Sequence, residues 1–130
     1  GPNQKNMLIS NIIDRVKTSN EITLSGGVGI YLSPIFIKDM IEIINSFLIL
    51  PNTQKARIAN VCGDQIVSLY DIIRIIESRI CKKGIIKITD DMPSYLFGNN
   101  DRLKRIIESP NFTQMDEGMD VTIANKLSLG

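Results

Sequence analysis

The chain of 130 residues is long enough for one domain with a core of its own, since 43% of its residues are hydrophobic and 22% are charged. Fifteen basic and fourteen acidic side chains leave a formal charge of +1, which is too small to attract a nucleic acid backbone. Its apolar stretches are too short for a membrane span, and no signal peptide is recognisable. We therefore expect a cytoplasmic protein that binds neither nucleic acid nor membrane.

The chain contains no histidine and only two cysteines, Cys62 and Cys81. Without histidine, one chain cannot assemble the usual four-ligand zinc site or a serine or cysteine triad. We interpret the two thiols as reduced core residues, with a disulfide between them as the alternative. Proton transfer would fall to carboxylates, lysines and tyrosines. We predict that residues outside this chain must complete any chemistry that it serves.

The first half of the chain alternates helical and extended patterns. Helical spacing of apolar residues predicts a helix over 4–20, and a short strand is expected at 21–24. A glycine turn at 25–29 leads into an extended run at 30–37, whose proline predicts an edge strand or a bent strand. A second helix is expected over 38–50.

In the second half, we predict a strand at 56–61 and then a helix that ends near Cys81. Ser68 and Asp71 resemble a capping box at its start. Further strands are expected at 84–88 and 95–97.

Two helices are predicted to close the chain, with Asn100 and Thr113 as their amino-terminal caps. The three longest helices should each bury a stripe on one face. These stripes are Ile12, Ile13 and Val16; Ile41, Ile44 and Phe47; and Ile72, Ile73 and Ile76.

Three features could carry chemistry, and each has a simpler interpretation. The loop at 26–29 could cradle a phosphate, but it leads into a strand, so an inter-strand turn is favoured. Asp90 and Asp91 could hold a cation, although adjacent strand residues point to opposite faces and a solvated turn explains them. No tyrosine is followed by lysine four positions later, so a catalytic tyrosine pair is absent.

The order of the segments resembles a known family. It runs through a helix, Ile22-Thr-Leu24 with glycines, Ser33-Pro-Ile-Phe-Ile-Lys-Asp39, a helix, and Ala59-Asn-Val-Cys-Gly-Asp64, and it continues with Asn100-Asp-Arg-Leu-Lys104 and Met115-Asp-Glu-Gly-Met119. This order is similar to the carboxy-terminal half of extended short-chain dehydrogenases/reductases, the NAD-dependent epimerases and dehydratases of nucleotide sugars. The resemblance spans nearly the whole chain.

The resemblance implies an α/β fold, a small domain of short strands in small sheets packed with about five helices. The family carries its dinucleotide and its Tyr-x-x-x-Lys pair on an amino-terminal Rossmann half, and neither motif occurs here. We therefore expect 1–130 to be a single substrate-binding domain of a longer enzyme, an isomerase or dehydratase. It would bind no cofactor by itself, and NAD or NADP would belong to the full-length parent.

The resemblance also implies where a nucleotide sugar would bind. The residues expected at its nucleotide end are Asn3, Met7, Leu8, Ile22, Thr23, Leu24 and Tyr31. Many relatives have a diphosphate-gripping arginine where this chain has Tyr31-Leu32, and Thr89 to Met92 replaces a second arginine-containing loop.

We weigh three functions. The first is the substrate-binding region of a nucleotide-sugar epimerase or dehydratase, with the missing Rossmann half as its partner. The second is a non-catalytic interaction or scaffold domain of the same architecture. The third, a self-contained small enzyme, is the least favoured. Because the missing half would leave an apolar surface open, we also expect the chain to form a homodimer at high concentration.

Overall fold

The structure, a computed structural model, describes residues 7–51, 58–108 and 110–128. Helices and strands alternate along it, as the sequence predicted. Their order is α1 (Leu8–Thr18), β1 (Glu21–Ser25), β2 (Ile30–Leu32), α2 (Ile37–Ile49), β3 (Val67–Ser68), α3 (Leu69–Ile80), β4 (Ile85–Thr89), β5 (Ser94–Leu96), α4 (Asp101–Ile106) and α5 (Met115–Ser128). The expected small α/β fold is confirmed.

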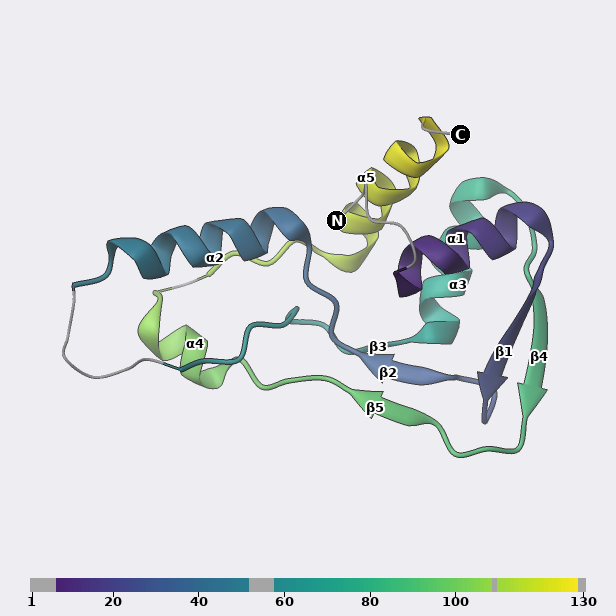
Figure 1. The fold of residues 1–130 in the computed structure, drawn as a ribbon, viewed down its shortest axis with the longest axis horizontal. Coiled ribbons are helices and arrows are strands. Elements are labelled where there is room, and N and C mark those ends of the chain that lie inside the picture. Colours follow the sequence, from purple (N-terminus) through teal and green to yellow (C-terminus); the bar gives the residue numbers. More distant parts are fainter. Residues whose placement is uncertain (1–6, 52–57, 109, 129–130) are drawn as a thin grey trace.

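The strands form two small sheets. In the first, β1 and β4 run parallel, with Glu21 opposite Ile85 and Ser25 opposite Thr89. In the second, β2 lies between β3, to which it is antiparallel, and β5, to which it is parallel. Figure 1 shows α1, α3 and the β1–β4 pair at one end of the elongated molecule, with α2 and α4 at the other.

The core lies where α1 and α3 pack together beside β1. Ile13 and Val16 of α1, Leu24 of β1 and Ile73 of α3 have no exposed surface. Met119 and other residues of α5 extend this core on its open side. Two of the three predicted stripes, those of α1 and α3, are confirmed because both helices present them to this contact.

The amino end of α3 forms as its sequence predicted. The hydroxyl of Ser68 accepts a hydrogen bond from the Asp71 amide at 3.1 Å, and the Asp71 carboxylate accepts from the Ser68 amide at 2.9 Å. This capping box satisfies two backbone donors at the amino end of α3, where Ser68 itself is buried. At its other end, α3 stops at Cys81, which has a left-handed backbone with φ 55°.

The glycine loop between β1 and β2 is a turn, as favoured from the sequence. Gly26, Gly27 and Gly29 all have positive φ, which side-chain-bearing residues rarely adopt. A side chain at Gly29 would stand 2.9 Å from Leu24 and 3.2 Å from Leu69, so this position is also closed by the core. The turn carries the chain from one sheet into the other.

Two predictions about strands were wrong. The described part of the predicted strand 56–61, residues 58–61, pairs with no strand, and residues 56 and 57 lie outside the described residues. The extended run at 30–37 shortens to β2, which is the central strand of its sheet and ends before Pro34. Proline lacks the amide that would continue the ladder, so the chain leaves the sheet at that point.

The predicted stripe of α2 was also wrong. Its buried residues are Asp39 and Ile43, while Ile41 and Ile44 are each about half exposed and Leu48 is 77% exposed. No described element packs extensively against α2. Its helical periodicity is real, but the face with Ile41 and Ile44 is not covered by the other described elements.

Two residues predicted as helix caps and one predicted in the core have other positions or contacts in the structure. Asn100 does not cap α4 with its side chain, and Thr113 is bound to Asp39 instead of capping α5. Asp39 accepts 2.7 Å hydrogen bonds from both the amide and the hydroxyl of Thr113, which ties α2 to the segment before α5. Cys81 is exposed rather than in the core, and both cysteines are free thiols.

A buried carboxylate joins α3 to β4. Glu77 is 6% exposed and accepts from the Gly84 amide at 2.8 Å, from Lys83 at 3.2 Å and from Arg74 at 2.9 Å. Burial alone would raise the pKa of Glu77, but the Gly84 amide and the two cations together lower it below its ordinary value. The charged carboxylate therefore fixes the turn that starts β4.

The core contact predicts the effect of Ile73→Ala. Because Ile73 has no exposed surface, its truncation should lower the free energy of unfolding by about 2–5 kcal/mol in chemical denaturation. Leu48→Ala on the outer face of α2 is the matched control and should change it by less than about 0.5 kcal/mol. Similar values for the two variants would contradict the placement of the core.

The Glu77 contacts predict a pH-dependent stability. Because the folded state lowers the pKa of Glu77, its contribution is complete above the ordinary carboxyl pKa and is lost as the pH falls through the lower folded value. Glu77→Gln should therefore cost about 1–3 kcal/mol near neutral pH and progressively less in acid, measured by urea denaturation at several pH values. An equal cost at every pH would show that the charge has no part in this contact.

Candidate functional site

The structure places Met7 and Leu8 together at the amino end of α1. Both side chains are largely exposed and line an apolar groove of about 240 Å³ with Leu32, Ile35 and Ile37. Asn3, the other residue expected near them, lies outside the described residues. The amino end of α1 therefore offers an accessible apolar surface at the position that the resemblance implied.

The side chains of β1 alternate between core and solvent. Ile22 and Leu24 are in the core, whereas Thr23 is exposed and lines an open polar hollow with Asn11 and Arg15. Hydrogen bonds to β4 occupy one edge of β1, and no described strand pairs with its other edge. Ile22 and Leu24 can thus offer a ligand only main-chain groups.

Tyr31 lies on β2 in an aromatic setting. Its ring stacks on that of Tyr95 with centroids 5.4 Å apart and planes 8° apart, and Phe97 meets Tyr95 edge-on at 6.2 Å. Neither Tyr31 nor Tyr95 lines the groove at Met7 or the hollow at Thr23. The described site residues are consequently distributed over three places and do not form one pocket.

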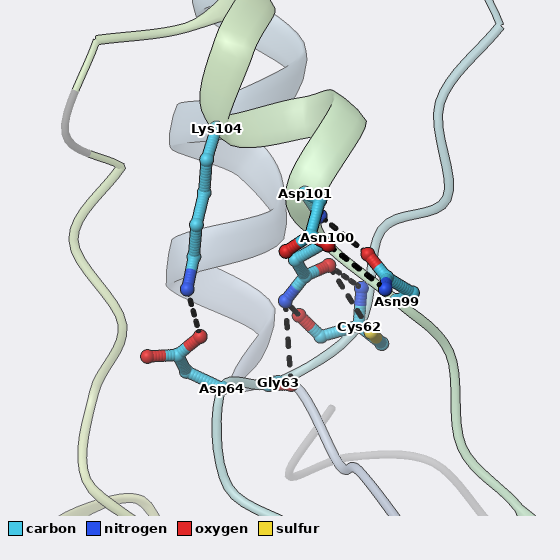
Figure 2. A network of polar contacts seen from close by, with 7 residues as sticks. All are labelled: Cys62, Gly63, Asp64, Asn99, Asn100, Asp101 and Lys104. Atoms are coloured by element: carbon cyan, nitrogen blue, oxygen red, sulfur yellow. Dashed lines mark hydrogen bonds and ion pairs between the residues drawn. The ribbon is translucent and has the colours of Figure 1, made fainter.

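A polar network that the sequence did not reveal connects the segment 62–64 to the start of α4 (Figure 2). Asn100 is 7% exposed, and its amide nitrogen donates to the Cys62 carbonyl at 2.7 Å. Its amide oxygen accepts from the Cys62 amide at 3.2 Å and from the Cys62 thiol at 3.1 Å. Asn100 thus supplies the main-chain partners that a neighbouring strand would otherwise provide. No local periodicity links residues so far apart in the chain.

Beside this network, Lys104 of α4 reaches back to Asp64 (Figure 2). The hydrogen bond to the Asp64 carboxylate raises the pKa of Lys104 above its ordinary value. These two side chains, with Phe97, Asn99 and Asp101, line an open groove of about 410 Å³. The lining of the groove mixes apolar with polar side chains, and its one ammonium, Lys104, is already paired.

Metal ligands do not gather in the described residues, where no group of three or more cysteine, aspartate or glutamate side chains could hold an ion. Asp91 accepts a hydrogen bond from the Thr89 hydroxyl at 2.8 Å within its turn. Among the described helices, none has the length and apolar character needed to cross a membrane.

No protein-family model and no curated protein matches the sequence. Solved structures do match its fold over the whole chain. The UDP-glucuronic acid 4-epimerase from Bacillus cereus, in complex with UDP-glucuronic acid and NAD, gives a TM-score of 0.84 at 18% identity over 100% of this chain and 43% of that chain. MoeE5 in complex with UDP-glucuronic acid and NAD gives 0.84 at 12% identity, over 100% of this chain and 44% of that one.

The UDP-glucose 4-epimerase of Thermus thermophilus, in complex with NAD, gives a TM-score of 0.75 at 15% identity, again over 100% of this chain and 44% of that chain. The present chain therefore spans less than half the length of the structures that it resembles. At these identities the likeness shows the fold alone, and it bears out the resemblance inferred from the sequence. The chain has the fold of the carboxy-terminal part of extended short-chain dehydrogenases/reductases.

Proposed function

We propose that this chain is the nucleotide-sugar-binding part of an NAD(P)-dependent epimerase or dehydratase and that a Rossmann half outside it supplies the dinucleotide. The main support is that its whole length matches 43% of an epimerase whose complex holds both UDP-glucuronic acid and NAD. In such a protein, the chain would hold the sugar nucleotide while the other half performs the redox chemistry.

The glycine turn of this chain does not fit a dinucleotide. It joins β1 to β2 and no helix starts there, so helix amides are not available to a pyrophosphate. The space that a ligand would need at Gly29 is filled by Leu24 and Leu69. The sequence also has no Tyr-x-x-x-Lys pair. We therefore assign no step of hydride transfer to this chain.

The nucleotide end of the substrate would lie along the predicted residues. Met7 and Leu8 offer exposed apolar surface, and the open edge of β1 offers main-chain donors and acceptors beside Thr23. Ile22 and Leu24 would take part through their backbone, and Tyr31 would take the place of an arginine. Asn3 completes the proposed set.

The scaffold alternative has one structural observation in its favour. The outer face of α2, with Ile41, Ile44, Leu48 and Ile49, is open and apolar, as a protein interface requires. If the chain is part of an enzyme, the same face would be covered by the missing half. Binding of a nucleotide sugar distinguishes the two functions, because only the enzyme part is expected to bind it.

Amide NMR spectra of the isolated chain should show whether it binds the sugar nucleotide or the dinucleotide. UDP-glucuronic acid should shift the amide signals of Met7, Leu8 and β1, with a dissociation constant of about 1 mM because half of the contacts are absent. NAD and NADP should shift none of them. Saturable micromolar binding of either dinucleotide would mean that the chain is the other half of the enzyme.

The variant Leu8→Asp adds a carboxylate beside the proposed nucleotide site. It should weaken UDP-glucuronic acid binding by about threefold or more through repulsion of the phosphates. Ile44→Asp adds the same charge to the outer face of α2 and is the matched control. If UDP-glucuronic acid binds but Leu8→Asp does not weaken it, the nucleotide end lies elsewhere on the chain; if no UDP-glucuronic acid binds, the scaffold function is favoured.

The open face of α2 predicts self-association. Because the exposed side chains of α2 include Ile41, Ile44, Leu48 and Ile49, two copies should pair through α2 at hundreds of micromolar protein, measured by light scattering over a concentration series. Leu48→Lys should return the chain to a monomer, whereas Ile88→Lys on β4 should not. A wild-type chain that stays monomeric throughout would contradict this use of the α2 face.

A further inference from the structure

Aromatic side chains collect on one face of the β3–β2–β5 sheet. Tyr31 stands opposite Tyr95 in the parallel β2–β5 register, so the two rings share a face. Their neighbours Ile30 and Leu32 point to the other face, where they pack against the core. The face that carries Tyr31 and Tyr95 is therefore the outer face of this sheet.

The aromatic rings of Tyr31, Tyr95 and Phe97 form a partly exposed surface on this outer face, which we call the ring surface. Tyr95 is 66% exposed although one side of its ring is stacked on Tyr31, and Phe97, at 47%, closes the cluster edge-on. The chain has no tryptophan and only seven aromatic residues, three of which stand here. Because β5 is the last strand of its sheet, no described strand covers the other side of the Tyr95 ring.

The aromatic cluster continues into a groove that carries hydrogen-bonding side chains. Phe97 belongs to the aromatic cluster and also lines the groove of about 410 Å³ beside Asn99, Asp101 and Lys104. The groove is held in shape, because buried Asn100 bonds the Cys62 segment and Lys104 is paired with Asp64. The exposed aromatic rings and a set of hydrogen-bonding groups are thus adjacent.

The charged side chains of the groove indicate which kind of ring-containing ligand could bind there. Asp64 and Asp101 contribute two carboxylates, whereas the single ammonium, Lys104, is already neutralised by Asp64. A phosphate would meet unbalanced negative charge and no free cation. Carboxylate and amide oxygens instead accept hydrogen bonds from hydroxyl groups, and the Asn99 amide can also donate them. An uncharged polyhydroxy ligand fits this lining.

We propose that the aromatic face of Tyr31, Tyr95 and Phe97, with the groove of Asp64, Asn99 and Asp101, binds a pyranose ring of an uncharged sugar. The C–H face of the sugar ring stacks on the open side of Tyr95, Phe97 borders it at about a right angle to that ring, and the sugar hydroxyls donate to the groove. Tyr31 is common to this site and to the proposed nucleotide end, whereas Met7, Leu8 and β1 belong only to the nucleotide end, and Tyr95, Phe97 and the groove belong only to this site.

Tyrosine fluorescence can test the site, since the chain has no tryptophan and two of its three tyrosines belong to the ring surface. Tyr70→Phe removes the third, so the remaining signal reports on Tyr31 and Tyr95 alone. The probes are maltohexaose, cellohexaose and chitohexaose, all uncharged pyranose oligomers. At least one should change the emission saturably, with a dissociation constant of about 1 mM that is unaffected by added salt.

Variants are measured by amide NMR titration with the oligomer that binds. Tyr95→Ala should weaken binding by about tenfold, while Tyr95→Phe should keep it within about threefold, because the ring and not the hydroxyl makes the stack. Leu96→Ala, equally exposed on the opposite face of β5, is the control and should bind as the wild type does. Circular dichroism checks that each variant is folded.

Three results would overturn the proposal. They are saturable binding of none of the oligomers, unchanged binding by Tyr95→Ala, and displacement of the bound oligomer by uridine, which would make the ring surface a nucleobase site. UDP-glucuronic acid binding at Met7 and β1 can persist in all three cases, so failure of this inference is distinguishable from failure of the proposed function.

Discussion

The burial of α1 against α3 beside β1 is the contact on which the rest of the structure depends. Ile13, Val16 and Ile73 lose all exposure there, so both helices must keep their apolar faces in a fixed orientation. The Glu77 carboxylate then holds the turn at Gly84, which sets the start of β4 against β1. The open edge of β1 and the amino end of α1 take their positions from this core.

Outside the core, the chain is joined by polar contacts. Asp39 binds Thr113 and Asn100 binds the Cys62 segment, while Ile43 of α2 and Leu103 of α4 are the apolar side chains of these helices that are buried apart from the main core cluster. On α2, Ile43 is buried whereas Ile41 and Leu48 remain open to solvent. The longer structures with this fold have additional chain, and a surface of this kind is where we propose that such a chain would pack.

The sequence predicted the parts of the fold that depend on local signals. Helical spacing predicted Ile13 and Ile73 in the core, and the pair Ser68 and Asp71 predicted the start of α3. It failed at residues whose partners are distant in the chain. Periodicity shows that Ile41 and Ile44 share a helix face but not whether this chain covers that face, and nothing near Asn100 indicates that it pairs with Cys62. The aromatic surface was missed for the same reason, because the β2–β5 pairing alone brings Tyr31 to Tyr95.

Native-state amide hydrogen exchange tests the central claim that α2 belongs against a surface outside this chain. At a concentration where the chain is monomeric, the account predicts that amides of α1 and α3 exchange only through global unfolding. The amides of α2 should exchange through a local opening at least about a hundredfold faster, because so little of that helix is buried. Exchange of α2 as slow as that of α3 would show that this helix is stable without an additional covering surface and would contradict its proposed packing against one.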